Sequence, residues 1–165
     1  MKLDLVTDWG KVRAYIRRAM NASFHVAFAT VNEAGEPTVT PIGSLVLNGD
    51  PTGLYMERFP RSIPANAEHN RHFCLLAENT RVGAIVKQLR GEGWFGVKLY
   101  GLLGERRPAT LAEVKRIQAR VPFTKLKRFQ QMLFGGTVYV RDLTFTRAEA
   151  VVLKVDKATR QVTTE

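Results

Sequence analysis

The sequence has little cysteine, no long apolar run and no segment typical of secretion. A single cysteine, Cys74, excludes an internal disulfide and a zinc site built on paired thiolates. Apolar runs such as 26–31 fall far short of the roughly 18 residues that a transmembrane helix needs. The N-terminus carries an acidic residue at Asp4 and lacks the apolar core of a secretory signal. We therefore expect a cytoplasmic protein that spans no membrane.

Acidic residues are few beside basic ones. The 165 residues include 25 Lys and Arg against 15 Asp and Glu, which gives a formal net charge of +10. This balance suits an anionic partner, either a nucleic acid or a phosphorylated small molecule, but it also keeps a protein soluble. The densest basic clusters lie at 13–18, 106–107, 115–116 and 125–128. Those after residue 110 fall in amphipathic helices, where basic residues usually form a solvated face, so nucleic acid is not the expected partner.

Length and composition indicate a single globular domain that covers residues 1–165. Domains usually contain about 100–200 residues. The hydrophobic share of 45% and the charged share of 24% are close to globular averages, which excludes wholesale disorder. No internal repeat or change in composition marks a boundary between domains.

The apolar pattern alternates between helical and strand periods. Val12, Tyr15, Ile16 and Ala19 follow the spacing of a surface helix, whereas shorter apolar runs between Gly, Pro, Asn and Asp turns indicate an antiparallel meander. Helices are predicted at 8–23, 62–70, 81–90, 110–120 and from 124 to the Gly135-Gly136 pair. Strands are predicted at 24–31, 38–47, 54–59, 72–77, 94–105, 137–146 and 150–155.

The order of these elements predicts a mainly β fold with outer helices. Strict βαβ alternation is absent, so a doubly wound parallel sheet is not expected. Pro41 cannot donate to a strand ladder, which indicates an edge or a bulge within 38–47. Gly96, Gly101 and Gly104 interrupt the 94–105 run and indicate the bends of a closed antiparallel barrel.

Two short motifs resemble known binding sites but lack the neighbouring elements that such sites require. Residues 91–96 match the string G-x-G-x-x-G, but a helix precedes them and a strand follows, the reverse of a dinucleotide motif. They are interpreted as a turn. His69, His72 and Cys74 are scattered about a helix–strand boundary, so we expect no metal site. No local sequence motif indicates a catalytic nucleophile paired with a base.

The stretch 57–66 concentrates groups that can bind an anion. Arg58, Arg61 and Ser62 stand at a strand end, directly before an expected helix start. Arginine forks, a hydroxyl and free helix amides are what a phosphate requires. A surface turn with two solvated arginines explains the same residues equally well.

The order of elements and their small motifs resembles the pyridoxamine 5′-phosphate oxidase-like split β-barrel flavoproteins. The resemblance covers roughly residues 11–105. It rests on the run FHVAFATV at 24–31, the Gly-Glu-Pro turn at 35–37, Pro41-Ile42-Gly43-Ser44, the strand 54–59, Arg61-Ser62, Asn70 before 72–77, and VKLYG at 97–101.

The resemblance implies a Greek-key-like split antiparallel barrel and a homodimer that holds FMN at the subunit interface. In such proteins the second strand lies along the isoalloxazine ring, and the matching positions here are Thr40, Pro41, Ile42, Gly43 and Ser44. The FMN phosphate is held by a threonine near the end of the third strand and by a Ser-Arg-Lys sequence that opens the next helix.

The phosphate-binding pattern is only partly matched in this sequence. Ser62 matches the serine, Arg58 stands where the threonine would be, and Ile63-Pro64 replace Arg-Lys. The expectation is that Arg58 and Arg61 supply the charge of the missing lysine and that Asn66 adds a hydrogen bond. The C-terminal substrate-phosphate motif of pyridoxamine phosphate oxidase itself is absent, so vitamin B6 oxidation is not expected.

The resemblance therefore implies an FMN-dependent oxidoreductase that acts on a small organic substrate. The flavin carries the chemistry in such enzymes, so no catalytic acid or base is required. One alternative is a non-catalytic barrel that binds flavin, haem or a deazaflavin, and another, suggested by charge alone, is a nucleic-acid-associated module. Trp94, Phe95 and Tyr100 are aromatic residues beside the expected flavin edge. Because aromatic residues are enriched in the cores of subunit interfaces, they favour a homodimer.

Overall fold

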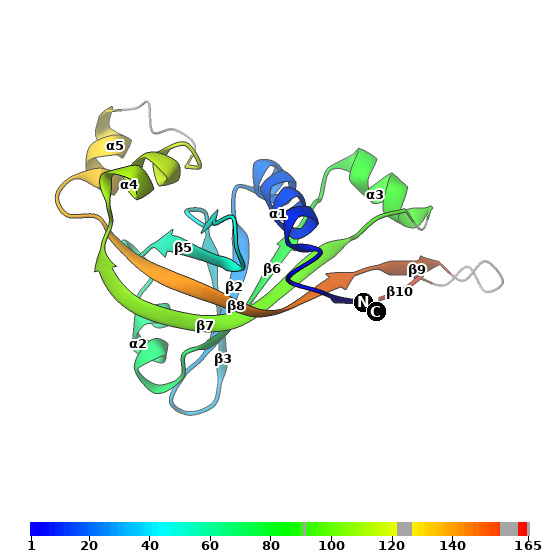
Figure 1. Cartoon of the computed structure of the whole chain (residues 1–165), viewed down its shortest axis with the longest axis horizontal. Coiled ribbons are helices and arrows are strands. Elements are labelled where there is room, and N and C mark those ends of the chain that lie inside the picture. The colour runs from blue at the N-terminus through cyan, green and yellow to red at the C-terminus, as the bar shows by residue number, and fades with distance from the viewer. Residues whose placement is uncertain (91, 122–126, 156–161, 165) are drawn as a thin grey trace.

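Residues 1–90, 92–121, 127–155 and 162–164 are described in the computed structural model, and they form an antiparallel sheet surrounded by helices (Figure 1). The strands of this sheet are β1 (Lys2–Leu3), β2 (Val26–Val31), β3 (Pro37–Ile42), β4 (Val46–Leu47), β5 (Thr52–Met56), β6 (His72–Glu78), β7 (Gly96–Pro108) and β8 (Tyr139–Val151). A separate pair is formed by β9 (Leu153–Val155) and β10 (Val162–Thr164). The helices are α1 (Trp9–Ser23), α2 (Ser62–His69), α3 (Val82–Leu89), α4 (Leu111–Gln118) and α5 (Lys127–Phe134).

The sheet is a split antiparallel barrel, as predicted. Its strand order is β3-β2-β6-β7-β8-β5-β4, with β1 added to β8, and every pairing is antiparallel. β3 and β4 follow each other in sequence but stand at opposite ends of this order, so the residues between Ile42 and Val46 connect its two edges. The long strands β7 and β8 curve across the molecule, and their curvature bends the sheet (Figure 1).

Two register shifts bend β7 against β8, one between Tyr100 and Gly101 and one between Leu103 and Arg106. A Cβ atom on Gly101 would lie 2.2 Å from the Thr144 carbonyl oxygen and 2.8 Å from a ring carbon of Phe73. Only a glycine lets the backbones approach this closely. The prediction that glycines mark bends in this strand is thus confirmed at Gly101.

The main core lies between the concave face of the sheet and α1. Val12 and Ile16 of α1 are fully buried, as their spacing predicts. Inside the sheet the rings of Phe28 and Phe73 stack with centroids 4.7 Å apart, and Tyr55 packs against Phe28 at 5.7 Å. A second cluster fastens α4 and α5 to the β4–β5 end of the sheet, and its buried members are Val46, Leu54, Met56, Ile117, Leu133, Val138 and Val140.

The helices begin and end close to the predicted residues. Asp8 is the N-cap residue of α1, and Asn70 is the C-cap residue of α2. Thr110 and Glu113 form the expected capping box at α4, in which the Thr110 amide donates to Glu113 Oε2 at 2.8 Å. The predicted start of the last helix at Thr124 lies outside the described residues. No helix in the described ranges has the length and apolar character needed to cross a membrane.

Two predicted strand boundaries are wrong. The segment 38–47 is not one strand, because the chain leaves the ladder after Ile42 and β4 begins only at Val46. β3 is an edge strand that pairs only with β2, which explains how it accommodates Pro41. β8 is continuous where two strands were predicted, because the charged stretch around Arg147 is paired with β7 and with β1.

We predict that Gly101→Ala destabilises the protein by about 3 kcal/mol or more, since the added methyl group meets backbone rather than a movable side chain. The measurement is urea unfolding followed by circular dichroism. Gly83→Ala is the control, because a Cβ atom at Gly83 in α3 meets nothing within 4 Å and is expected to be neutral or to stabilise by up to about 1 kcal/mol. Equal stability of the two variants would contradict this account of the bend.

Candidate functional site

A cavity of about 370 Å³ opens at the point where β3 ends, and we call it the β3 cavity. All five residues predicted to lie along a flavin ring line it: Thr40, Pro41, Ile42, Gly43 and Ser44. The opposite wall comes from the end of β5 and from the region of α4 and α5, with the residues Met56, Phe59, Pro60, Val121 and Leu133. The lining is mostly apolar, which suits a flat ring system.

The wall formed by residues 40–44 is held by hydrogen bonds to the end of β5. The Met56 amide donates to Ser44 Oγ at 3.0 Å, and the Ser44 hydroxyl donates back to the Met56 carbonyl at 3.4 Å. A Cβ atom on Gly43 would lie 3.0 Å from the Phe24 carbonyl oxygen, so a larger residue there would push this wall outward. The break between β3 and β4 therefore positions the cavity wall.

The start of α2 lies beside the β3 cavity. The hydroxyl oxygens of Ser62 and Thr40 are 3.1 Å apart, which joins the predicted phosphate segment to the predicted ring segment. Arg61 is the N-cap residue of this helix, and the Ser62 side chain turns toward β3. The Arg61 side chain is exposed and has no hydrogen-bond or ion-pair partner within the described part of the chain.

Arg58 lies on the other side of the same loop. Its Nη2 atom donates to the Gly135 carbonyl at 3.1 Å, and the side chain lines a separate cavity of about 540 Å³ beneath α2. Pro60 borders both cavities, which places Arg58 near the β3 cavity but outside its lining. Ser62 thus contacts a residue of the β3 cavity, whereas the side chains of Arg58 and Arg61 do not line that cavity.

Asn66 points into the protein rather than toward Arg61. Its Nδ2 atom lies 2.8 Å from Thr30 Oγ1 and 2.8 Å from Thr38 Oγ1, so both amide hydrogens are donated inside the fold. The hydrogen bond expected from Asn66 to a phosphate is therefore not available in this structure. Its contacts tie α2 to β2 and β3. Ile63, which stands where the family has arginine, is fully buried in the core.

A buried ion pair lies beside this region, and it was not predicted from the sequence. Arg141 Nε donates to Glu57 Oε2 at 2.5 Å, and both side chains are almost fully buried. Tyr55 donates its hydroxyl to the same carboxylate at 2.8 Å, and Arg106 Nε lies 3.4 Å from it. Burial raises the pKa of Tyr55 far above its ordinary value, and the charge of Glu57 adds to the shift. The hydroxyl therefore remains a hydrogen-bond donor.

The sequence signal for this pair is weak: Glu57 and Arg141 each begin a pair of charged residues that follows an apolar strand segment. Burial opposes the charged form of Arg141, but the hydrogen bonds and charge of Glu57 outweigh burial and raise the pKa of the arginine. Arg141 Nη1 also donates to the Gly104 carbonyl of β7 at 2.9 Å. The pair thereby joins β8 to β7 and to the loop that carries Arg58 and Arg61.

Sequence models of protein families give no match to this chain. Curated protein sequences give no significant match either. Solved structures do: an FMN-binding protein from Syntrophomonas wolfei superposes with a TM-score of 0.62 at 15% identity, over 88% of this chain and 89% of that chain. A Clostridium acetobutylicum protein of the pyridoxinephosphate oxidase family, related to general stress protein 26 of B. subtilis, gives a TM-score of 0.56 at 13% identity over 94% of each chain. An F420 reductase gives 0.53 at 15% identity, over 76% of this chain and 88% of that chain.

The fold is the pyridoxamine 5′-phosphate oxidase-like split barrel. This confirms the resemblance stated from the sequence at the level of the fold. The three aromatic residues expected near the flavin, Trp94, Phe95 and Tyr100, do not line the β3 cavity of their own chain. The Trp94 ring packs on Tyr15 of α1 at 5.7 Å, and Tyr100 lies beneath the guanidinium of Arg147 at 3.7 Å.

We predict that Arg141→Met destabilises the split barrel by about 3 kcal/mol, because it leaves the buried Glu57 carboxylate with only Arg106 nearby. Urea unfolding at neutral pH measures the difference. Arg147→Met on the same strand is the control, since the pair of Arg147 with Glu149 is partly exposed and contributes less than about 1 kcal/mol. A similar loss in both variants would show that the Glu57–Arg141 pair has no special role.

Proposed function

We propose that this chain binds FMN in the β3 cavity and acts as a flavin-dependent oxidoreductase on a small organic substrate. The observation that carries the proposal is the 3.1 Å contact between the hydroxyls of Thr40 and Ser62. It joins an apolar cavity, suited to a ring, to the start of a helix that offers amides and an arginine to a phosphate. The similarity to an FMN-binding protein supports the assignment.

The donors at the start of α2 fit a phosphate. The backbone amide of Ser62 lies in the first turn of the helix, where no intrahelical acceptor exists for it. The Arg61 guanidinium is exposed and forms no ion pair with an acid among the described residues. Arg58 adds a second positive charge nearby, held by a carbonyl rather than a carboxylate. A dianion therefore finds positive charge here that is not already neutralised.

The role of the chain in such a reaction is to bind and orient. Bound FMN would supply hydride or electron transfer, as flavins do in other enzymes. Pro41, Ile42 and Met56 would cover the ring and exclude water from it, while Ser44 fixes their wall through its hydrogen bonds to the end of β5. No side chain of the chain is required as an acid or a base in this proposal.

A second candidate is a barrel that binds a deazaflavin, with or without turnover. The observation that favours it is the structural similarity to an F420 reductase. The same apolar cavity and cationic helix start would serve this ligand, so the two candidates differ in the ligand rather than in the residues. The visible spectrum of the purified protein and titration with both ligands distinguish them.

We predict that Arg61→Ala weakens FMN binding about ten- to a hundredfold, the effect of losing one hydrogen bond to a charged group, about 1.5–3 kcal/mol. Flavin fluorescence quenching measures the affinity. Arg81→Ala is the matched control, because Arg81 is also an exposed N-cap arginine but stands at the start of α3. An unchanged affinity in folded Arg61→Ala places the phosphate elsewhere. If a deazaflavin binds and FMN does not, the second candidate replaces the first.

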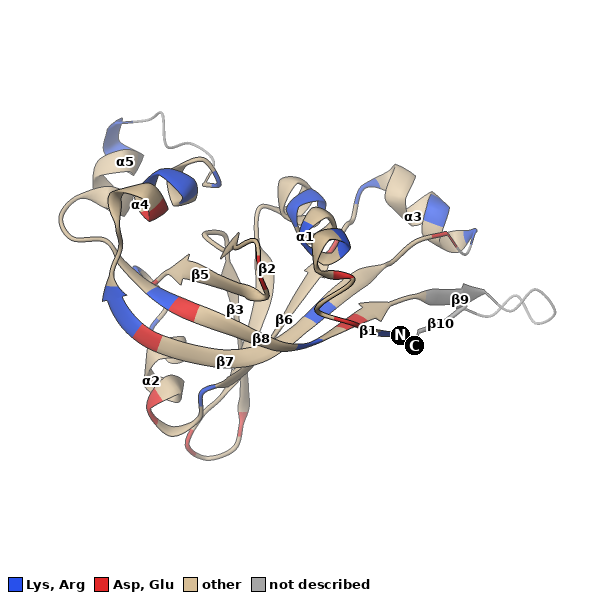
Figure 2. Ribbon diagram, in the orientation of Figure 1, with Lys and Arg blue, Asp and Glu red and all other residues tan. Residues whose placement is uncertain are grey.

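We also propose that the chain forms a homodimer through the outer face of β2, β3 and β6. These strands alternate, so that Phe28 points into the core and its neighbours Ala27 and Ala29 point outward beside Pro41 and Val39. Val39 is 66% exposed, and neither β2 nor β3 carries a charged residue, as Figure 2 shows. A second copy on this face would cover apolar surface continuous with the β3 cavity.

Val39→Lys is expected to shift the protein toward monomers, because it places a charge in the centre of the proposed interface. Sedimentation velocity over a wide concentration range measures the association state. Val82→Lys introduces the same change at a valine that is 78% exposed on α3, and this variant should sediment as the wild type does. A wild-type protein that is monomeric at every concentration would overturn the dimer.

A further inference from the structure

Four arginines from two helices line one cavity of about 500 Å³ on the face of the molecule between α1 and α4. Arg13 and Arg17 come from α1, and Arg116 and Arg120 come from the C-terminal end of α4 and the residues after it. Figure 2 shows basic bands on both helices. The remaining lining residues carry no charge: Gly10, Ala14, Val46, Leu47 and Ala119. We call this cavity the four-arginine cavity.

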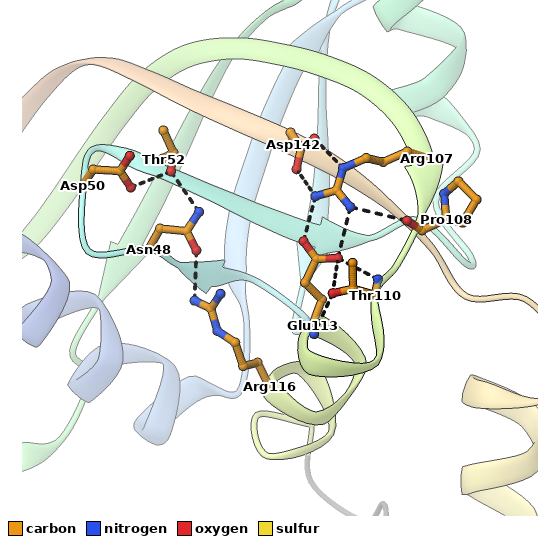
Figure 3. A network of polar contacts seen from close by, with 9 residues as sticks. All are labelled: Asn48, Asp50, Thr52, Arg107, Pro108, Thr110, Glu113, Arg116 and Asp142. Carbon is orange, nitrogen blue, oxygen red and sulfur yellow. Dashed lines mark hydrogen bonds and ion pairs between the residues drawn. The ribbon is translucent and has the colours of Figure 1, made fainter.

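The two arginines on the α4 side are held by neutral partners. Arg116 Nη2 donates to the Leu47 carbonyl at 3.0 Å and to Asn48 Oδ1 at 2.9 Å, and Figure 3 shows the side chain reaching Asn48. Arg120 Nη1 donates to Asn21 Oδ1 at 3.3 Å. These contacts fix the direction of both guanidinium groups without neutralising their charge. Two of the four guanidinium groups are therefore positioned by the fold.

A nearby arginine shows how this fold neutralises charge elsewhere. Arg107 Nε donates to Asp142 Oδ2 at 2.7 Å, and its Nη2 donates to Glu113 Oε1 at 2.7 Å (Figure 3). Glu113 belongs to α4, the same helix that carries Arg116. Acids are therefore available on this helix, yet among the described residues none lines the four-arginine cavity.

The positive charges in the cavity repel one another. Arg13 and Arg17 stand four residues apart on α1, a spacing at which like charges destabilise a helix by about 0.2–0.5 kcal/mol. Burial lowers the pKa of Arg120, and the positive charge of Arg17 lowers it further, which shows that the two helices act on each other electrostatically. An anion in the cavity would remove this repulsion.

The sequence-based interpretation assigned the basic cluster near residue 116 to a solvated helix face. Arg116 is exposed, in agreement with this, and the structure adds that its side chain lines the cavity between α1 and α4, to which the loop after α4 also brings Arg120. Arg13 and Arg116 are about a hundred residues apart in sequence, so no local pattern could reveal that they meet. Their convergence is a property of the fold.

We propose that the four-arginine cavity binds a small polyphosphate anion, either pyrophosphate or the phosphate chain of a nucleotide. Guanidinium groups bind phosphate oxygens through paired hydrogen bonds, and several of them favour a ligand that carries more than one phosphate. The concave shape and the uncharged floor formed by Val46 and Leu47 suit a compact ligand more than an extended nucleic-acid strand. The site shares no lining residue with the β3 cavity, so it is independent of flavin binding.

Isothermal titration of the full chain at constant ionic strength tests the proposal, with orthophosphate, pyrophosphate and ADP as probes. Pyrophosphate is expected to bind at least about tenfold more tightly than orthophosphate, because it can contact more of the arginines. Equal affinity for pyrophosphate and ADP identifies the phosphates as the recognised group, and tighter binding of ADP identifies a nucleotide. Failure of pyrophosphate and ADP to bind at millimolar concentration, or binding of an oligonucleotide alone, overturns the proposal.

Arg17→Gln provides the decisive variant, because Arg17 is exposed and removing its charge also relieves the repulsion. We expect this variant to bind pyrophosphate about ten- to a hundredfold more weakly while its unliganded melting temperature stays the same or rises. Arg18→Gln is the control: it makes the same change one residue later, but Arg18 lines a different cavity between α1 and α3. Arg18→Gln should bind pyrophosphate as the wild type does. An equal loss in both variants would mean that only the net charge of the protein attracts the anion.

Discussion

The buried ion pair between Glu57 and Arg141 fixes the end of β5 against its neighbours in the sheet, β8 and β7. Glu57 follows β5, and Arg141 lies in β8 and also donates to the Gly104 carbonyl of β7. Because both charges are almost completely removed from water, neither can leave the other without a large desolvation penalty. The position of Glu57 is therefore fixed, and the loop that follows it contains Arg58 and Arg61 and leads into α2. The geometry of the candidate phosphate site is set by an interaction that takes no part in binding.

A second group of small polar side chains holds the open edge of the barrel. β3 has a neighbouring strand, β2, on one side only, so on its other side the contacts that position it come from side chains. Asn66 reaches Thr38, and Ser62 reaches Thr40, which fastens α2 along this edge strand. Ser44 then fastens the end of the segment to β5. A binding site needs side chains whose own positions are constrained, and the β3 cavity has this support on two of its sides.

The features predicted correctly from the sequence depend on neighbours close in the chain. The limits of α1 and α2, the Thr110–Glu113 capping box and the edge position of Pro41 follow from spacing and from the chemistry of single residues. The features that were missed depend on distant partners. Glu57 and Arg141 are 84 residues apart, and the inward direction of Asn66 is set by Thr30, 36 residues away. A periodic pattern carries no information about such pairs, so the sequence predicted which segments form the site but not which side chains face into it.

The net charge of +10 does not indicate where an anion would bind, because that depends on where each arginine lies and what it is paired with. Arg107 is paired with two acids, and its hydrogen bond lowers the pKa of Glu113 to about 2, so this pair remains charged across the physiological range and serves to anchor α4. α4, anchored in this way, then presents Arg116 to a cavity in which no acid of the described chain faces it. Positive charges that share one cavity repel one another and lower the stability of the folded chain, whereas an isolated charge on a convex surface costs almost nothing. Where a fold has acids within reach and keeps them away from its arginines, the location of those arginines is better evidence for a ligand than their number.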